Sequence, residues 1–360
     1  MKKIVAFAFI AVPFLIWSCS KDDDSTQTTS TNDQAANRVL MMQSVTDNWL
    51  LPHLDTLVSE SQELQSLAHQ YQANPTESNL QLVKDQWLIA AKSWVAIECS
   101  NIGDAKYTFL YANAYTYPID TTRINDLSSD SVTNEIITNA PSNAIGLAAI
   151  EFLLFEQDLS NQNVKLQSKH FTDWLVGLTD AFYSNAVSIK DFWVDEYASE
   201  FRANEGTGTS EPISLIFNGM VSAIDYMKTN ELGEALGKTG YQPDTTQLRA
   251  FYSGYSKELY QAQFASIYDC YNRGDLGFDW LISEMKLDYS NQLATEVIGS
   301  FKSTSSDISA TPSNWNQGVE NQDQSLEDLY SEITTLIRLN KSDVASHLSL
   351  TITFSDSDGD

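Results

Sequence analysis

Apolar residues recur at helical spacing along most of this 360-residue chain. In "GLAAIEFLLF", for example, Gly146, Ala149, Ile150, Leu153 and Leu154 are spaced at i, i+3, i+4, i+7 and i+8, which places them on one face of a helix. The same pattern predicts eight long helical stretches: residues 34–72, 75–100, 132–157, 164–201, 211–230, 245–271, 275–304 and 317–342.

The breaks in this pattern are as informative as the pattern itself. Pro52 and Pro141 predict a kink or break within the first and third helical stretches, because proline lacks the N–H that a helix interior needs. Residues 104–130 are rich in Tyr, Asn, Thr and Asp and predict a long loop, a kind of segment that is often functional. The closing "HLSLTITF" alternates apolar and polar residues, which predicts one short β-strand.

The polar, glycine-containing segment "RANEGTGTSEPIS" predicts a boundary in the middle of the chain. About four helices precede it and about four follow it. We therefore expect an all-α protein of two four-helix-type bundles, over residues 34–203 and 208–360, with a short β-like C-terminal segment. The similar halves suggest an internal duplication.

The N-terminus has the layout of a targeting segment. Lys2 and Lys3 precede an apolar run shorter than the roughly 20 residues that cross a bilayer, and the run ends in "IWSCS". This ending resembles a bacterial lipobox, with residues 1–18 as signal peptide and lipid on Cys19; the alternative is an ordinary signal peptide with an unrelated cysteine. The polar residues 19–33 favour the lipobox, because they predict a disordered tether. Their "SKDDD" also resembles the acidic export tag of surface lipoproteins in Bacteroidota.

The formal net charge of −27 argues against nucleic-acid binding, which requires a basic surface. It also means that lipid, not charge, would hold the chain to an anionic membrane. Apart from Cys19 there are only Cys99 and Cys270, which are open to two interpretations: one disulfide or two separate thiols. Without a CxxC motif, neither a zinc ribbon nor a thioredoxin-type site is predicted.

Glu151 is the one charged residue in "GLAAIEFLLF", and an ionised carboxylate on a buried helix is costly unless it is bonded, paired or bound to a metal. Two interpretations are open. Glu151 meets a basic side chain or a backbone donor, or it acts as a ligand or proton-handling residue.

A second carboxylate has a suggestive setting. Trp87, Trp94 and Glu98 are spaced by 7 and 4 residues, so they share one helix face, which either packs in the core or walls a pocket. If this face meets the helix of Glu151, two carboxylates share one site and need a cation or a proton between them. Glu98 and Glu151 are thus candidate metal ligands, and no HExxH, GxSxG or GxGxxG motif offers an alternative centre.

In their order along the chain, these parts resemble the imelysin-like family, also called peptidase M75. The resemblance rests on "VKDQWLIAAKSWVAIE", a "YP" loop and "GLAAIEFLLF"; "NELGEALGK", "YSGYS" and "ITFSDSDGD" are similar to its Bacteroidota branch. The family implies two helical bundles with a site between or beside them, and links to iron uptake and to peptidase activity.

The family's hallmark GxHxxE maps onto residues 146–151, where Gly146 and Glu151 match but Ala148 stands at the histidine position. Alanine can neither ligate a metal nor transfer a proton, so a hydrolytic mechanism that relies on this pair is in doubt. The predicted ligand-binding residues are Gly146, Ala148, Glu151, Trp87, Trp94 and Glu98, with Cys19 as the lipidation site.

The resulting hypothesis is a non-catalytic outer-membrane lipoprotein, facing the periplasm or the cell surface, that binds a ligand or metal in iron uptake. The resemblance implies iron or another divalent cation as a cofactor. The lipobox makes the membrane a partner through lipid on Cys19, and the resemblance implies an outer-membrane iron-uptake receptor as a second partner. The alternatives are an M75-type metallopeptidase and a protein- or glycan-binding module built on the aromatic loop "YTFLYANAYTYPIDTTR".

Overall fold

A computed structural model describes residues 31–353, except 129–131, 204 and 275. The signal peptide and tether predicted over residues 1–33, including Cys19, lie almost wholly outside this part of the chain. The regular secondary structure of the described part is helical and contains no strand, which confirms the all-α prediction. None of its helices is long and apolar enough to cross a bilayer.

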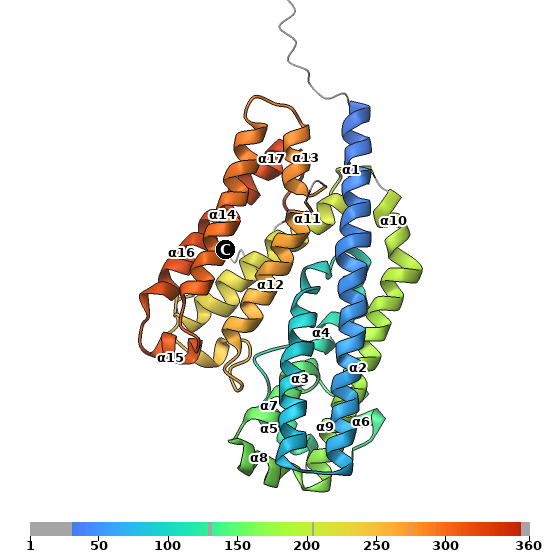
Figure 1. Ribbon diagram of the computed structural model, residues 1–360, viewed down its shortest axis with the longest axis vertical. Coiled ribbons are helices and arrows are strands. Elements are labelled where there is room, and N and C mark those ends of the chain that lie inside the picture. Colours follow the sequence, from blue (N-terminus) through green and yellow to red (C-terminus); the bar gives the residue numbers. More distant parts are fainter. Residues whose placement is uncertain (1–30, 129–131, 204, 275, 354–360) are drawn as a thin grey trace, which may run out of the picture.

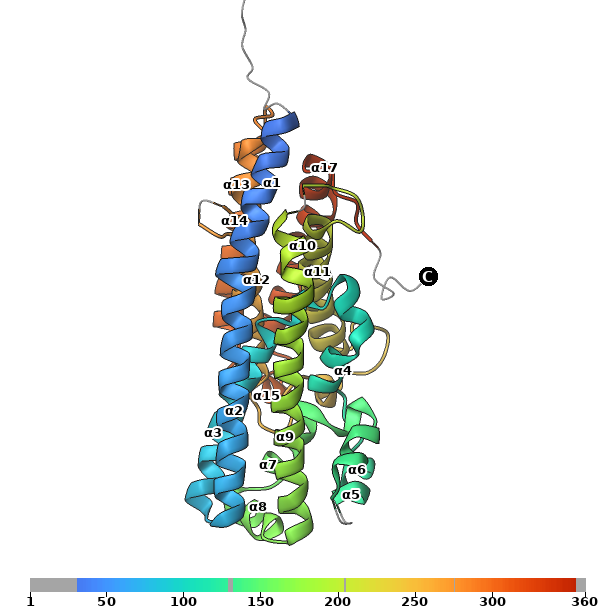
Figure 2. The same ribbon diagram turned by 90° about the vertical axis from the view of Figure 1, so that its right-hand side faces the viewer.

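The first predicted helix forms one continuous rod that runs along most of the molecule (Figures 1 and 2). It consists of α1 (Thr31–Val45), a π-helical turn (Thr46–Leu50) and α2 (Leu51–Ala73). The wide turn ends just before Pro52, and this is the local adjustment expected of a helix that must accommodate a proline.

The helices of the first half pack around α2, which contacts both α3 and α9. α7, which carries "GLAAIEFLLF", contacts α3 and α9 in turn and is buried over nearly its whole length. The bounds are α3 (Glu77–Val95), α4 (Leu110–Ala114), α5 (Thr121–Ser128), α6 (Asn134–Asn139), α7 (Gly146–Phe155), α8 (Leu159–Leu166), α9 (Lys169–Asp191) and α10 (Ala198–Ala203).

The second half is built mainly from α11, α12, α14 and α16 and lies beside the upper part of the rod in Figure 1. The bounds are α11 (Pro212–Tyr226), α12 (Ser256–Tyr271), α13 (Phe278–Glu284), α14 (Ser290–Ala310), α15 (Trp315–Glu320), α16 (Gln324–Arg338) and α17 (Ala345–His347). π-helical turns follow α9 (Phe192–Tyr197), α11 (Met227–Gly233) and α16 (Leu339–Val344).

The two halves share one continuous cluster of buried apolar residues. α1 packs against α11 and α13 as well as α10, and α12 packs against α3. Trp49 in the rod joins them by a hydrogen bond: its Nε1 donates to Ser266 Oγ of α12 over 3.0 Å, and that hydroxyl donates to the Ala96 carbonyl at 2.6 Å. The internal duplication stays a prediction.

Three expectations are corrected by the structure. Residues 104–130 are not one open loop, because 3₁₀ turn Gly103–Thr108 and helices α4 and α5 lie within them. The segment 248–255 is irregular although a helix was predicted from residue 245. The predicted β-strand is absent up to residue 353, since this segment meets no other strand; instead Thr353 N–H donates to Asn218 Oδ1 and Asn218 Nδ2 donates to the Thr351 carbonyl.

Candidate functional site

Glu98 lies in a 3₁₀ turn (Glu98–Ser100) just beyond the end of α3, not on the helix that its spacing predicted. This turn packs against α11 of the second half. Gly219 on α11 permits the approach: a Cβ at this position would lie 2.4 Å from the Cys99 carbonyl oxygen. The glycine thereby brings the Glu98 carboxylate to the junction of the two halves.

Arg249 is the cation that meets Glu98. It comes from the irregular segment before α12, and its side chain is only 2% exposed. Its Nη1 and Nη2 donate to Glu98 Oε2 and Oε1 over 2.8 and 3.2 Å, a bidentate arrangement that is strong and well directed. Gln263 Nε2 of α12 adds a second donor to Glu98 Oε2 at 2.8 Å.

A third element supplies Glu231, from the π-helical turn after α11. Its Oε1 lies 2.8 Å from Arg249 Nη2, at 3% exposure, as an ion pair without the geometry of a directed hydrogen bond. Burial raises the pKa of Glu231 to about 7; the charge of Glu98 adds to the rise and Arg249 opposes it. Burial would lower the pKa of Arg249, but the two carboxylates outweigh it and raise that pKa well above its ordinary value.

The rings of Tyr115 and Tyr117 lie over the Arg249 guanidinium, with centroids 5.2 and 5.1 Å away. Cation–π contacts of this kind are strongest when the cation is desolvated, as here. The tyrosines belong to the loop predicted to be functional, where the Tyr117–Pro118 bond is cis. The loop therefore helps to bury the guanidinium among Glu98 and Glu231.

The structure shows how the buried carboxylate of Glu151 is satisfied. It is 3% exposed, and its Oε1 accepts a hydrogen bond of 2.7 Å from the backbone N–H of Ser253. Burial raises its pKa to about 7, and hydrogen bonds from the backbone of Ser253 and Tyr252 limit the rise. Its partner is thus a backbone donor, one of the alternatives open from the sequence.

The same irregular segment, residues 248–255, serves both predicted carboxylates. Arg249 pairs with Glu98, and Ser253, four residues later, bonds Glu151. Both carboxylates also raise the pKa of Tyr115, whose hydroxyl is buried near them, although burial is the larger cause. The structure thus brings Glu98 and Glu151 to one region, with protein groups as their partners.

The two predicted tryptophans are core residues in this structure. Trp87 donates from Nε1 to the Leu147 carbonyl at 2.9 Å and packs edge-on against Phe155. Trp94 is 1% exposed, beside the ring of Tyr111. Of the two, neither lines the cavity at Glu98.

Gly146 and Ala148 have different roles in α7. Gly146 has φ +70°, and a Cβ there would lie 2.4 Å from the Ala114 carbonyl oxygen, so this position needs glycine. Ala148 is 2% exposed and offers no donor or acceptor in its side chain. The glycine of the motif thus sets how closely α7 approaches the preceding loop.

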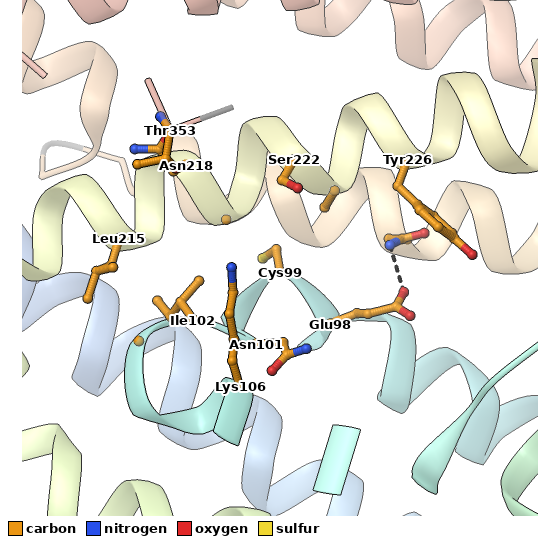
Figure 3. Close-up of a pocket in the computed structure, with 14 residues that line it drawn as sticks. Glu98, Cys99, Asn101, Ile102, Lys106, Leu215, Asn218, Ser222, Tyr226 and Thr353 are labelled. Atoms are coloured by element: carbon orange, nitrogen blue, oxygen red, sulfur yellow. Dashed lines mark hydrogen bonds between the residues drawn. The ribbon is translucent and has the colours of Figure 1, made fainter. Parts of the chain in front are cut away.

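A cavity of about 410 Å³ opens beside Glu98, between the turns after α3 and the face of α11 (Figure 3). The side chain of Glu98 is 24% exposed, and its carboxylate points toward Tyr226. The lining is mixed, with Glu98, Cys99, Asn101, Ile102, Gly103, Lys106, Leu215, Asn218, Gly219, Ser222, Ala223, Tyr226, Gln263 and Thr353. We call this cavity the Glu98 pocket.

The donor set fits a resident metal poorly. Glu98 already accepts hydrogen bonds from Arg249 and Gln263, and Glu151 accepts one from the Ser253 N–H. The Ala148 side chain has no atom that could bind a metal. Within the described residues no group of three or more His, Cys, Asp or Glu side chains is arranged to hold an ion. The Arg249 guanidinium at Glu98 and a backbone N–H at Glu151, and not a metal ion, meet these carboxylates.

Arg249, Glu231 and the two tyrosines were not identified from the sequence. Arg249 fell inside a predicted helix, and Glu231 lies in "NELGEALGK", which was noted only for its resemblance. The signal for Tyr115 and Tyr117 was present, because their loop was predicted to be functional. Cys99 and Cys270 are two buried free thiols, in line with one of the two interpretations.

Comparison with known proteins agrees with the sequence resemblance. Residues 50–339 match the family model described as imelysin, peptidase M75. A crystal structure of an imelysin-like protein from Psychrobacter arcticum 273-4 aligns with a TM-score of 0.73 at 18% identity, covering 91% of this chain and 98% of that one. A putative iron-regulated protein A precursor from Parabacteroides distasonis ATCC 8503 aligns with a TM-score of 0.71 at 15% identity, covering 90% and 97%. The comparison with curated protein sequences gives no match.

Proposed function

The chain belongs to the imelysin family, and from this premise we propose that it is a non-catalytic cell-envelope lipoprotein that binds an organic ligand in the Glu98 pocket and serves iron acquisition. One observation carries the proposal. The carboxylates at the site are satisfied by Arg249, Gln263 and the Ser253 N–H, while a cavity of ligand size stays open beside them.

A metallopeptidase is the weaker alternative. It would need a metal with an open position for water, held by three or more protein ligands. Ala148 replaces the family's histidine, and a metal that coordinates Glu98 would have to displace Arg249 from its oxygens. These residues supply no metal-activated water, so we derive no hydrolytic step from them.

The aromatic loop offers little surface for a protein or glycan partner. Tyr111 and Tyr115 are buried, and Tyr115 and Tyr117 cover Arg249. Of the aromatic residues in this loop, only Tyr107 and Phe109 are strongly exposed, at 79% and 71%. The loop thus serves mainly as part of the wall around the buried guanidinium.

The iron context comes from one of the structural neighbours, which is described as a putative iron-regulated protein. The location comes from the sequence: lipid on Cys19 would anchor the chain to the outer membrane, facing the periplasm or the cell surface. For a chain at this location with a role in iron acquisition, we propose an outer-membrane iron-uptake receptor as the partner.

Growth under iron limitation tests the proposed function. A strain that lacks this chain should grow more slowly than its parent when a chelator limits iron, and equally well when iron is abundant. Glu98→Gln should reproduce the growth defect at an unchanged protein level, because the pocket loses the negative charge of Glu98. Glu63→Gln, an exposed position on α2, is the matched control and should grow as the parent does. Normal growth of the deletion strain under limitation would remove the iron role.

A further inference from the structure

The Glu98 pocket presents opposite charges to a ligand. Glu98 and Lys106 both reach into it from the turns after α3, with α11 opposite them (Figure 3). Lys106 is exposed, and no ion pair involves it within the described residues. Its ammonium therefore stays available to an anionic group.

The Glu98 end of the pocket favours a cation. Above about pH 7, where the raised pKa of Glu231 leaves it ionised, Glu98 and Glu231 share a single guanidinium, and the cluster carries one net negative charge. Glu98 is the carboxylate that the pocket exposes, whereas Glu231 is buried. The ring of Tyr226, 39% exposed, lies where the carboxylate points and offers a π face to an ammonium group.

The remaining lining suits a small molecule with polar and apolar parts. Asn101 Oδ1 is buried in the wall without a hydrogen-bond partner within the described residues, so it can accept from a ligand N–H. Leu215 and Ile102 provide apolar contact on the other side of Lys106 in Figure 3. Asn218 is less available, because it holds the backbone of Thr351 and Thr353.

We propose that the Glu98 pocket binds a small zwitterion of the amino-acid or dipeptide class. The ligand ammonium would meet Glu98 and Tyr226, its carboxylate would meet Lys106, and its side chain would contact Leu215 and Ile102. A simple cation would be repelled by Lys106 and a simple anion by Glu98, so only a ligand that carries both charges satisfies both ends. This inference rests on the proposed function, since it names the ligand class of the same site.

Isothermal titration of the purified protein tests the ligand class. The probes are each common L-amino acid and the dipeptide alanyl-alanine; for any that binds, the α-amide and the N-acetyl derivative follow. At least one zwitterion should give saturable heat, and each blocked derivative should bind at least about tenfold more weakly, since each loses one charge pair worth about 1.4 kcal/mol. If no probe binds, or if a blocked derivative binds as well as the zwitterion, the proposal is overturned.

Substitutions locate the binding. Lys106→Met and Glu98→Gln should each weaken the zwitterion at least about tenfold, whereas Lys302→Met, an exposed lysine on α14, should leave binding unchanged. The Lys106 side chain makes no hydrogen bond or ion pair within the described residues, so Lys106→Met tests the proposal even if Glu98→Gln folds poorly. Equal affinity in Lys106→Met and in the wild type would overturn the proposal.

The two proposals fail separately. If no zwitterion binds but Glu98→Gln still slows iron-limited growth, the ligand class is wrong and the proposed function stands. If a zwitterion binds and the deletion strain grows normally when iron is limiting, the ligand class stands and the iron role is wrong.

Discussion

Arg249 is the residue on which the site depends. Its guanidinium is paired with two carboxylates and covered by two tyrosine rings, and of these Glu98 and the tyrosines are distant in the sequence. A buried ion pair of this kind contributes little net stability by itself, but removal of one partner is costly because the others stay buried without compensation. Arg249 therefore acts in place of a metal ion as the cation that makes two buried carboxylates tolerable.

Arg249→Met should lower the free energy of unfolding by about 3–5 kcal/mol, because it keeps the volume but leaves Glu98 and Glu231 without their cation. Urea denaturation measures this loss. The control is Arg202→Met, which breaks an ion pair with Asp47 at 35% and 46% exposure and should cost less than about 1 kcal/mol. Equal losses of unfolding free energy in the two variants would show that the buried Arg249 matters no more for stability than an exposed ion pair.

Glu151 predicts a pH dependence of stability. Its pKa is about 7 in the folded protein, against an ordinary value of 4.5, so the folded state holds a proton that the unfolded state has lost. Stability should therefore fall as the pH rises from about 4.5 to about 7, and level off above that. Glu231 acts in the same direction over the same window.

Glu151→Gln should remove its share of this fall, since glutamine stays neutral and can still accept from Ser253 N–H. The measurement is the free energy of unfolding in urea between pH 5 and pH 8, compared with Glu63→Gln at an exposed position of α2. A wild type and a Glu151→Gln variant with parallel pH profiles would contradict the buried, proton-retaining carboxylate.

At the scale of elements, the periodicity of apolar residues predicted most helices but not the segment that builds the site. Residues 248–255 continue the apolar spacing of α12, so the sequence favoured a helix there. The structure instead has left-handed backbone at Ala250 and Gly254, with φ of 59° and 73°. Contacts with Glu98 and Glu151, made far away in the sequence, stabilise this conformation, and local periodicity cannot report them.

The two predicted carboxylates illustrate the same limit. The apolar surroundings of Glu151 and the spacing of Glu98 with Trp87 and Trp94 made the two carboxylates candidates for one site, because an ionised group in an apolar setting is costly without a partner. Both contact the segment 248–255 in the structure, and their role as ligand-binding residues stays a prediction. The partner of Glu151 could not be predicted, because every residue type except proline has a backbone N–H and the sequence does not show that the one of Ser253 is the donor. The spacing of Trp87 and Trp94 equally fitted a core and a pocket wall, and they are core residues.

The start of α7 gives a prediction about an element. Gly146→Ala should destabilise the protein by about 1–3 kcal/mol, because its φ is +70° and the added Cβ would meet the Ala114 carbonyl. Gly299→Ala in α14 is the control: nothing lies within 4 Å of the added atom, so it should stabilise the helix by about 0.5–1 kcal/mol. Opposite signs in thermal or urea denaturation are expected, and a neutral Gly146→Ala would contradict the close approach.

At the scale of the whole molecule, the site exists because two halves with a shared core meet. Glu98 and the tyrosines come from the first half, and Arg249, Glu231 and Gln263 from the second. The first half alone would leave Glu98 without its cation, so the polar cluster also favours one relative arrangement of the halves. The Glu98 pocket lies at this same junction, where binding sites are commonly found.

The central claim is that the protein's own groups, and not a metal, satisfy the carboxylates of this site. The most direct test is titration of the purified protein with zinc and, without oxygen, with ferrous ion, using Glu63→Gln as the control for weak binding to its acidic surface. We expect no stoichiometric metal that depends on Glu98 or Glu151. One tightly bound equivalent, lost in both Glu98→Gln and Glu151→Gln and retained in the control, would contradict it and would reopen the metallopeptidase alternative.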